Sequence, residues 1–556
     1  MYKQVLDPVG GSLAASALVA MLPLATLFVL LGGLKLKAHI AGLAALVVAM
    51  ILAIAVWGMP FGTTVAVATE GAAFGLFPII WIIWNAIWIY NMTVETGHFA
   101  VLRRSFGSIS DDQRIQAIII AFCFGALLEA LAGFGTPVAI TAVMLIAVGF
   151  SPMKAAAIAL VANTAPVAFG AIATPIVTLA ELTDIPKEDL GAMVGRQTPL
   201  LALFVPLILV GMVDGWRGVR AVWPAALVGG VTFAVGQFVS SNFISVELTD
   251  IIGALLSVGA MVLFLRVWQP GDPLLVEEGG GGRPAMAGAA EHDAAHEAAV
   301  RRREGHGKDS TADIVKAYAP YLIIIVVFAI AQWGPIKDFL AKGATEFTWP
   351  GTGDIQTAEG EAPSATTYKF GWLAAAGTLL LVSGLITMAV LKVKPGAALR
   401  AYGAMLNQLK WATLTVMAVL ALAYVMNLSA QTLSIGNWIA GAGGVLAFLS
   451  AIIGWIGVAV TGSDTSANSL FGVLQVTAAK EAGLDPTLLA SANSSGGVLG
   501  KMISPQNLAI GAAAVGLDGE EGELFRRVVG WSLALLLIMC VLVYLQSTAV
   551  LSWMVV

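Results

Sequence analysis

The chain has 556 residues, of which 58% are hydrophobic and 11% are Asp, Glu, Lys or Arg. Soluble domains have roughly 45–50% apolar and about 25% charged residues, so this composition excludes a soluble globular protein and indicates a polytopic integral membrane protein. The formal net charge of -5 comes without a basic stripe, which argues against nucleic-acid binding, and both cysteines lie in apolar runs rather than in a disulfide framework.

Apolar runs of about 20 residues, the length needed to cross a bilayer, predict ten membrane spans. They lie at about 12–34, 38–57, 66–90, 190–212, 221–240, 250–268, 317–333, 370–391, 411–430 and 528–548. Two further regions, about 113–182 and 438–512, are apolar throughout but are interrupted by Gly, Pro, Ser, Thr and Asn clusters. Each is expected to contribute one more crossing, which gives about 12 transmembrane helices.

The Lys and Arg residues of the short loops fall on one side, the cytoplasm, only if residues 113–150 enter the membrane and return without crossing. The same reasoning makes residues 438–482 return to the outside. We therefore predict two re-entrant helical hairpins that open to opposite faces.

The longest polar stretch is Gly- and Ala-rich and predicts a flexible cytoplasmic linker at 269–316. It divides the chain into a first repeat at 1–220, two connecting spans at 221–268 and a second repeat at 317–556. The chain shows no metal cluster, nucleotide-binding loop or nucleophile–base pair, so we expect no cofactor, no metal and no enzyme activity.

The two irregular regions repeat the same order of small and polar residues. Gly133-Phe134-Gly135-Thr136-Pro137 and Gly462-Ser463-Asp464-Thr465-Ser466 open them, and Asn163-Thr164 and Asn493-Ser494-Ser495 follow, with 27 residues from Thr136 to Asn163 and 28 from Thr465 to Asn493. Inverted repeats with discontinuous helices point to a secondary transporter with a site near the bilayer midplane.

Two of the breaks contain a hydroxyl residue followed by proline, the pattern of an N-cap and a first helical position. These are Thr136 before Pro137 and Ser504 before Pro505. Exposed N–H groups and the positive end of a half-helix would then point into the cavity and attract an anion.

At these positions the chain resembles the lactate permease family, through Phe124–Ile140, Ala162–Ile172, Thr461–Asn468 and Lys501–Asn507. The resemblance covers nearly the whole chain. It implies proton-coupled import of L-lactate, D-lactate and glycolate across the cytoplasmic (inner) membrane of a prokaryote. A second, fold-level resemblance is to elevator transporters of di- and tricarboxylates, which fixes no substrate. The expected fold is thus an all-α, elevator-like polytopic protein.

Ionisable side chains at membrane depth cost at least about 2.5–3.5 kcal/mol each and mark candidate functional residues. Four stand out: Glu70, Glu129, Asp464 and Lys501. Burial disfavours the charged form of a carboxylic acid, which suits a group that binds and releases a proton. We predict Glu129, or else Asp464, as the proton carrier, with a structural Asp464–Lys501 pair as the alternative.

A lactate-like substrate carries one carboxylate and one 2-hydroxyl. We predict that polar residues at the breaks meet the carboxylate, and that Thr136 or Ser463 contacts the hydroxyl. The predicted substrate-binding residues are Gly133, Gly135, Thr136, Asn163, Thr164, Ser463, Thr465, Ser466, Asn493, Ser494, Ser495 and Lys501.

Two other transport functions stay open at this point. Hydroxyls, broken-helix carbonyls and Asp464 also suit a hard cation, which makes sodium-coupled carboxylate transport the main alternative. The second alternative is an anion channel with re-entrant loops. Two inverted halves fit such a channel less well than they fit a transporter with alternating access. The expected partners are lactate or glycolate, the proton and the lipid bilayer; the sequence gives no oligomeric state.

Overall fold

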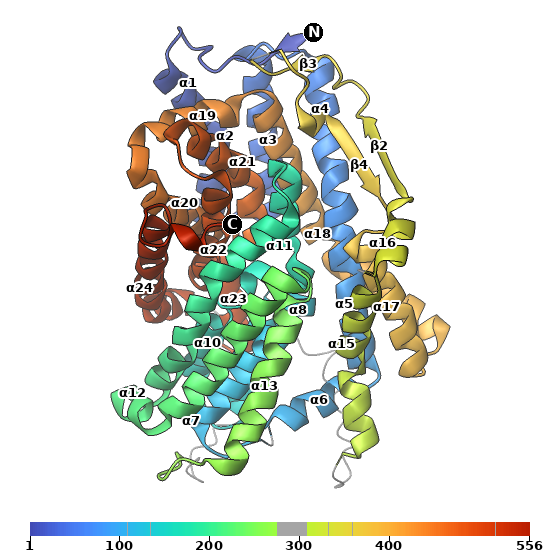
Figure 1. Cartoon of the computed structure of the whole chain (residues 1–556), viewed down its shortest axis with the longest axis vertical. Coiled ribbons are helices and arrows are strands. Elements are labelled where there is room, and N and C mark those ends of the chain that lie inside the picture. The colour runs from blue at the N-terminus through green and yellow to red at the C-terminus, as the bar shows by residue number, and fades with distance from the viewer. Residues whose placement is uncertain (108, 134, 275–308, 332, 359, 518) are drawn as a thin grey trace.

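The computed structural model describes residues 1–556 apart from 108, 134, 275–308, 332, 359 and 518. The described residues form a helical bundle, with the strands and the N-terminus at one end (Figure 1). Most of the predicted linker at 269–316 lies outside the described residues.

Ten helices of the described chain are long and apolar enough to cross a membrane, or eleven if one bent pair is a single span. Apart from α12 (Lys187–Phe243) and the two irregular regions, the helices include α1 (Leu13–Ala20), α2 (Leu22–Phe28), α3 (Ala38–Ala55), α4 (Phe61–Phe74), α5 (Trp81–Glu95), α6 (His98–Gly107), α13 (Thr249–Val267), α15 (Thr311–Ala331), α16 (Gly334–Ala341), α17 (Ala376–Val390), α18 (Pro395–Leu428) and α24 (Glu521–Gln546). The predicted span at 370–391 is shorter than expected, since α17 has 15 residues.

The predicted spans at 190–212 and 221–240 both lie in α12 (Lys187–Phe243), which folds back on itself. Its helical backbone is broken at Asp214 and Gly215, and Thr198 donates to Gln237 Oε1 at 3.1 Å across the fold. The count of ten includes this 57-residue segment as one helix, although it consists of two antiparallel halves. This accounts for part of the difference between ten observed and twelve predicted transmembrane helices.

The first irregular region begins with a helical hairpin, here hairpin 1 (residues 113–147). Its first arm runs through α7 (Gln113–Gln116), a π-helical stretch (Ala117–Phe124) and α8 (Gly125–Ala132), and its second arm is α9 (Thr136–Ala147). The side chain of Gln113 donates to the carbonyl of Val148 at 3.3 Å, so the two arms meet again at their base.

The second irregular region begins with hairpin 2 (residues 446–482), formed by α20 (Leu446–Thr461) and α21 (Asp464–Ala482). Ser450 donates to Gln475 Oε1 at 2.9 Å between the arms. The arm α20 follows α19 (Gln431–Ile439) and a short 3-10 turn. Both predicted hairpins are therefore antiparallel helix pairs with Gly-containing tips.

A broken helix follows each hairpin. Broken helix 1 consists of α10 (Pro152–Ala162) and α11 (Gly170–Thr183), whose axes bend by 66°. Broken helix 2 consists of α22 (Pro486–Gly500) and α23 (Pro505–Ala514), with a 3-10 turn between them. The order hairpin, then broken helix, occurs in each half of the chain.

The bases of the two hairpins lie at opposite ends of the molecule, where α7 and α19 are labelled in Figure 1. At the base of hairpin 1, Arg114 donates to Asp112 at 2.6 Å, to Asp214 at 3.2 Å and to the carbonyl of Asp272 at 2.6 Å. Next to hairpin 2, Ser434 of α19 donates to the carbonyl of Leu6, beside the N-terminus.

Short strands cover the end of the molecule near the N-terminus. Strand β1 (Tyr2–Lys3) pairs in parallel with β3 (Ile355–Gln356), and β2 (Ala344–Thr348) pairs antiparallel with β4 (Thr367–Gly371). Tyr2 also donates to the carbonyl of Ser429 at 2.9 Å. These pairings hold the N-terminal segment against two remote parts of the chain.

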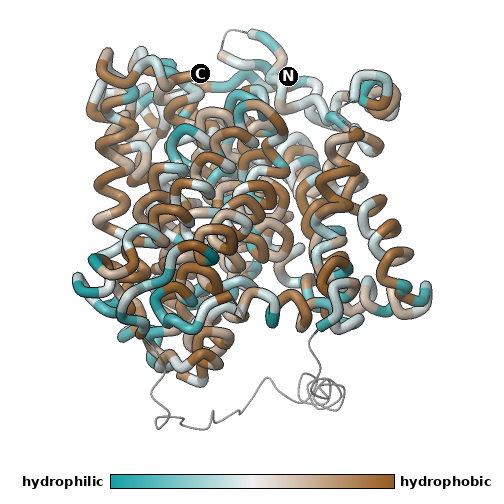
Figure 2. The backbone as a smooth tube through the Cα atoms, turned by 60° about the horizontal axis from the view of Figure 1, so that its bottom comes forward, coloured by the Kyte–Doolittle hydropathy of each residue, from teal (hydrophilic) through white to brown (hydrophobic). Residues whose placement is uncertain are grey.

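Large apolar side chains cover much of the outer surface. Examples from four helices are Ile51 (56% exposed), Leu263 (64%), Val326 (53%) and Leu537 (57%). Hydrophobic residues also make up long stretches of the helices in Figure 2, while hydrophilic residues lie at both the upper and the lower edge. An apolar belt of this size is what lipid contact requires, since lipid replaces water as the solvent of these faces.

Candidate functional site

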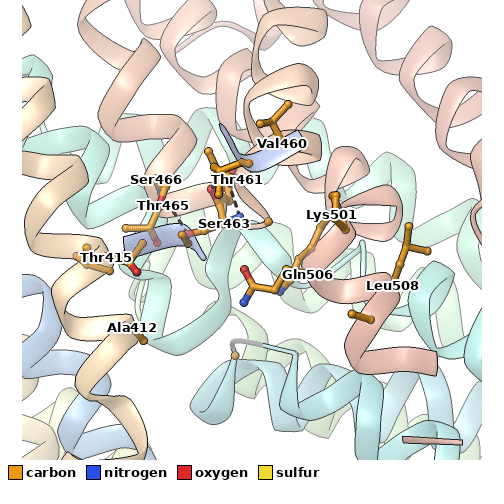
Figure 3. Close-up of a pocket in the computed structure, with 18 of the residues that line it drawn as sticks. Ala412, Thr415, Val460, Thr461, Ser463, Thr465, Ser466, Lys501, Gln506 and Leu508 are labelled. Carbon is orange, nitrogen blue, oxygen red and sulfur yellow. Dashed lines mark hydrogen bonds between the residues drawn. The ribbon is translucent and has the colours of Figure 1, made fainter. Parts of the chain in front are cut away.

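A cavity of about 930 Å³ lies where the hairpin tips and the broken helices meet. Its inner wall comes from Glu129, Gly133, Gly170, Thr174 and Pro175 in the first half, and from Thr461, Gly462, Ser463, Asp464, Thr465, Ser466, Lys501 and Gln506 in the second. Figure 3 places Lys501 and Gln506 on one side of this space and Ser466, Thr465 and Thr415 on the other.

The central contact of the site is an ion pair between the two halves of the chain. Lys501 Nζ lies 2.7 Å from Glu129 Oε1, and Asn163 Nδ2 donates to Glu129 Oε2 at 2.9 Å. All three side chains are buried. The expected Asp464–Lys501 pair is not formed; Lys501 pairs with Glu129 instead.

Glycine at position 170 makes room for this carboxylate. A Cβ on Gly170 would lie 2.8 Å from Glu129 Oε1 and 3.0 Å from its Cγ, which is closer than real contacts allow. Gly170 begins the second part of broken helix 1. The break therefore lets the backbone approach the carboxylate as well as changing the helix direction.

Asp464 is the second buried carboxylate of the site and is 3% exposed. Its Oδ2 accepts from Ser494 Oγ at 2.6 Å, while its Oδ1 has no hydrogen-bond partner among the described residues. A Cβ on Gly497 would lie 2.4 Å from Oδ1. A buried carboxylate with one unpaired oxygen is costly when charged.

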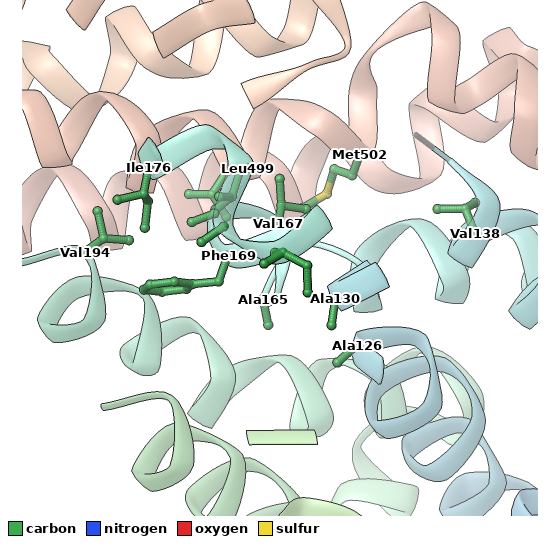
Figure 4. Close-up of a cluster of buried hydrophobic side chains, with 14 of the residues drawn as sticks. Ala126, Ala130, Val138, Ala165, Val167, Phe169, Ile176, Val194, Leu499 and Met502 are labelled. Carbon is green, nitrogen blue, oxygen red and sulfur yellow. The ribbon is translucent and has the colours of Figure 1, made fainter. Parts of the chain in front are cut away.

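A cluster of buried hydrophobic side chains includes sequence neighbours of the ion pair. Figure 4 shows this cluster, to which Ala126 and Ala130 of hairpin 1, Phe169 of broken helix 1, and Leu499 and Met502 of broken helix 2 contribute. Each of these side chains is at most 1% exposed. Charges beside such a cluster interact more strongly than charges in water.

The half-helix N-termini have the caps that the sequence suggests, with one shift. Ser504 is the N-cap of α23, and its hydroxyl accepts from the N–H of Asn507 at 3.3 Å. Ser463 caps α21 in the same way through Ser466 N at 3.2 Å. In hairpin 1 the N-cap is Gly135, with φ 84°, and Thr136 is the first helical residue rather than the cap.

Of the predicted site residues, the cavity brings together Glu129, Gly133, Ser463, Asp464, Thr465, Ser466 and Lys501. The remaining ones do not line it. Asn163 and Ser494 lie directly behind it as partners of Glu129 and Asp464. The others, Gly135, Thr136, Thr164, Asn493 and Ser495, are further from the cavity, and Thr164 donates to the carbonyl of Val161 in its own helix.

Asn493 belongs to a buried amide network instead. Its Nδ2 donates to Asn468 Oδ1 at 2.9 Å, and its Oδ1 accepts from Gln475 at 3.3 Å. Asn468 in turn donates to the carbonyl of Pro175, a residue of the cavity wall, at 3.1 Å. The network therefore fixes hairpin 2 against broken helix 1.

Some residues of the cavity wall are not among the sequence predictions. Gly170, Thr174 and Pro175 follow the first break by a few residues, and Gln506 follows the N-cap and proline of the second. Proximity to a capped half-helix N-terminus was a usable signal for Gln506. No local signal marks Thr415 of α18, since it comes from a regular helix.

The mouth of the cavity is basic and aromatic. Lys35, Lys37 and His39 line it, and the ring of His39 stacks on Trp411 with centroids 4.4 Å apart. Glu521 at the start of α24 faces the same mouth. The loop at 35–37 is one that the charge pattern assigns to the cytoplasm.

The family model described as L-lactate permease matches residues 16–550. An L-lactate permease of Bacillus subtilis (strain 168) is 41% identical over 100% of both chains, and the glycolate permease GlcA of Escherichia coli (strain K12) is 41% identical over 98% of both. The solved structure of Neisseria gonorrhoeae MtrF, titled as illuminating a class of antimetabolite efflux pumps, gives a TM-score of 0.44 at 14% identity over 87% of this chain and 83% of its own.

The family match spans nearly the whole chain and includes both hairpins, both broken helices and the Glu129–Lys501 pair. The chain belongs to the L-lactate permease family.

Proposed function

We propose that the protein is a secondary transporter that imports L-lactate, D-lactate and glycolate by proton symport across the cytoplasmic membrane. The names of its relatives, L-lactate permease and glycolate permease, support the substrate class. The observation that carries the coupling proposal is the buried Glu129–Lys501 ion pair at the cavity wall.

The charge balance of the site explains why a proton is needed. Lys501 is the basic residue of the inner cavity wall, and Glu129 already neutralises it. A substrate carboxylate that entered beside this pair would be a buried charge without a partner, which is costly. One of the two anions must therefore give up its charge.

Protonation of Glu129 resolves this competition. The proton binds at Glu129 Oε1, the ion pair breaks, and the ammonium of Lys501 pairs with the substrate carboxylate. The sum of charges on Glu129, Lys501 and substrate is zero in the loaded state, as it is for the empty pair. Proton and substrate anion thus enter together, one of each, and the empty carrier returns with its ion pair restored.

Asp464 is the second candidate for the proton. It lies on the tip of hairpin 2, and the unpaired Oδ1 is the atom that would take a proton or a cation. Sodium coupling stays the alternative for the same reason, because the Oδ1 atoms of Asp464 and of Asn507 both lack hydrogen-bond partners among the described residues. Oxygen atoms of this kind are the ligands of a hard cation.

We further propose alternating access by an elevator-like movement of two inverted repeats. Support comes from the hairpin and broken helix in each half, and from the hairpin bases at opposite ends of the bundle. The mouth at Lys35 and Lys37 lies on the side assigned to the cytoplasm, so the present state is open inward. Basic groups at this mouth attract organic anions.

Purified protein in liposomes tests the coupling. Labelled L-lactate uptake is measured with a proton gradient or a sodium gradient imposed alone. We expect accumulation with an acidic outer solution at equal sodium on both sides. Accumulation with the sodium gradient alone, and none with the proton gradient, would overturn proton symport in favour of the alternative.

Competition against labelled lactate tests the substrate class. Glycolate lacks one methyl group, worth about 0.8 kcal/mol, and is expected to compete within about fivefold of lactate. Malate brings a second negative charge to a wall with one lysine and is expected to compete hardly at all. A malate affinity equal to that of lactate would contradict the monocarboxylate assignment.

A further inference from the structure

Gln506 is a polar residue of the cavity wall with no role in the charge balance above. It is the second residue of α23, directly after Pro505, and its side chain is exposed to the cavity. Neither its amide oxygen nor its amide nitrogen makes a hydrogen bond to another described residue, whereas Asn507 next to it is fully engaged through its nitrogen. In Figure 3 the amide of Gln506 points into the space that Ser463 also faces.

Hairpin 2 holds Gln506 in place from the other side. Gly462 at the tip has φ 75°, and a Cβ there would lie 2.8 Å from Gln506 Oε1. The left-handed backbone favours glycine at this tip, and the missing Cβ leaves room for the amide of Gln506. Gln506 lies between the tip of hairpin 2 and the break of broken helix 2.

Most other hydroxyl groups of the wall are engaged. Thr174 donates to Ala171 O at 2.5 Å, Thr461 to Gly457 O at 2.8 Å, and Thr415 to Trp411 O at 2.8 Å. The hydroxyl of Ser463 caps α21. Each of these four hydroxyls already takes part in one hydrogen bond with the backbone of its own helix.

The hydroxyls of Thr465 and Ser466 make no hydrogen bond to another residue of the described chain, but Figure 3 separates them from Lys501. This matters because a 2-hydroxyl sits on the carbon next to the carboxylate, so the group that recognises it must lie close to the group that binds the carboxylate. Lys501 and Gln506 flank the same short break, and Figure 3 places them together.

We propose that Gln506 is a specificity-determining residue that hydrogen-bonds the 2-hydroxyl of the substrate while Lys501 binds the carboxylate. A primary amide suits this task because its oxygen accepts from a hydroxyl and its nitrogen donates to one. The proposal rests on the proposed function and replaces Thr136 and Ser463, the sequence-based candidates for the hydroxyl contact.

The test compares lactate with propionate, which has the same carboxylate and carbon chain but no 2-hydroxyl. Inhibition constants against labelled lactate are measured for wild type and for Gln506→Met, which keeps the side-chain length without the amide. In wild type the lost hydrogen bond is expected to make propionate about 5- to 150-fold weaker than lactate. In Gln506→Met the ratio of the propionate inhibition constant to the lactate inhibition constant is expected to fall below about three. The reason is that lactate loses affinity while propionate keeps its affinity.

Propionate binding in the variant serves as the control for folding. Thr415→Val is the matched substitution, since it removes a wall hydroxyl that is bound to Trp411, and it is expected to leave the ratio at its wild-type value. If Gln506→Met does not fold, Gln506→Asn is used; its amide is one methylene shorter, and the ratio is expected to fall at least about threefold.

An unchanged ratio in Gln506→Met, or in the Asn variant, overturns the proposal. So does loss of discrimination in Thr465→Val or Ser466→Ala alone, which would place the hydroxyl contact on hairpin 2. Failure of the wild-type protein to bind or transport lactate is a different result, because it overturns the proposed function itself. The wild-type assay is therefore done before any variant is tested.

Discussion

The ammonium of Lys501 lies 2.7 Å from the carboxylate of Glu129, although 372 positions separate the two residues in the sequence. One residue comes from the first half of the chain and the other from the second. The pair thus joins hairpin 1 to broken helix 2, and any event that breaks it changes both charge and contact between the halves.

Replacement of Glu129 by Gln is expected to abolish proton-driven accumulation and to leave lactate–lactate exchange. The loaded carrier stays neutral without Glu129, but the empty carrier must return with an unpaired ammonium, at a cost of at least about 2.5 kcal/mol. Net transport should therefore slow about 50-fold or more. Uptake and counterflow in the same liposomes check this, and undiminished accumulation would remove Glu129 as the proton carrier. Asp464→Asn is the parallel variant for the second candidate.

The pH dependence of substrate affinity is a separate prediction. In wild type the apparent affinity for lactate is expected to weaken as pH rises, because the charged Glu129 competes for Lys501. In Glu129→Gln the affinity is expected to be independent of pH over the same range. Competition binding between about pH 5 and 9 checks both, and a parallel decline in the two proteins would contradict the competition.

Replacement of Lys501 by Met is expected to destabilise the protein by about 3–5 kcal/mol, since it leaves the Glu129 charge buried without a partner. The double variant Glu129→Gln, Lys501→Met should regain most of that stability while transport stays absent. Thermal unfolding in detergent and uptake assays measure the two effects. A double variant as unstable as the single one would show that the pair has no role in holding the halves together.

Asp112 at the base of hairpin 1 gives a prediction for acid stability. Burial alone would raise the pKa of Asp112, but the hydrogen bonds from Arg114 and from Leu274 outweigh it and hold the pKa below its usual value. The pKa of Asp112 is thus lower in the folded protein than in the unfolded chain, where it is about 3.9. This carboxylate therefore stabilises the fold above that pH, and the contribution is lost as the pH falls.

We therefore expect Asp112→Asn to lower stability at pH 7 by about 3 kcal/mol and to lose less stability than wild type on acidification. The matched control is Asp272→Asn, whose side chain is 75% exposed in a pair with Arg217 and should change stability by under about 1 kcal/mol. Equal effects of the two substitutions would contradict the role of burial at the hairpin base.

Accessible cysteines test the sidedness of the hairpins. After Cys123 and Cys540 are replaced by Ala, Ser151→Cys is expected to react with an impermeant thiol reagent only from the cytoplasm, and Glu481→Cys only from outside. Both positions are exposed in the structure. Labelling of both from the same side would refute the inverted arrangement.

Asn493→Ala is expected to lower stability by about 1–3 kcal/mol, because it leaves the buried Oδ1 of Asn468 without a partner and removes one of the two hydrogen bonds that Gln475 Nε2 donates. It should leave the ratio of lactate to glycolate affinity unchanged. A change in that ratio without loss of stability would return Asn493 to the substrate-binding residues, where the sequence pattern places it.

The interruptions of the two irregular regions can be located from the sequence because their signals are local. Glycine, proline and capping residues act within a few positions, and a charge inside an apolar run, such as Glu129 or Lys501, is conspicuous. Local signals carry no distance information between remote segments. They therefore could not decide whether Lys501 pairs with Asp464, 37 residues away, or with Glu129 in the other half.

Small polar residues at membrane depth were harder to assign. Asn163 and Asn493 occupy equivalent places in the repeated pattern, yet one supports the ion pair and the other a packing network. An amide serves either purpose, and the pattern does not reveal which face of a helix meets the cavity. For the same reason the sequence pattern did not identify Gln506 as a candidate site residue. Its amide is of interest because the tip of hairpin 2 approaches it, and that contact is not visible in the sequence.

The N-terminal strand has a consequence for the order of biosynthesis. Tyr2 and Gln4 bond to the backbone of residues 427–429, so a segment made early must wait for partners made 423 to 427 positions later. During that interval the segment has none of these contacts. A ribosome stalled before the end of α18 would therefore hold a chain in which Tyr2 and Gln4 lack these hydrogen bonds. The bonds form only after the second half of the chain has been made as far as the end of α18.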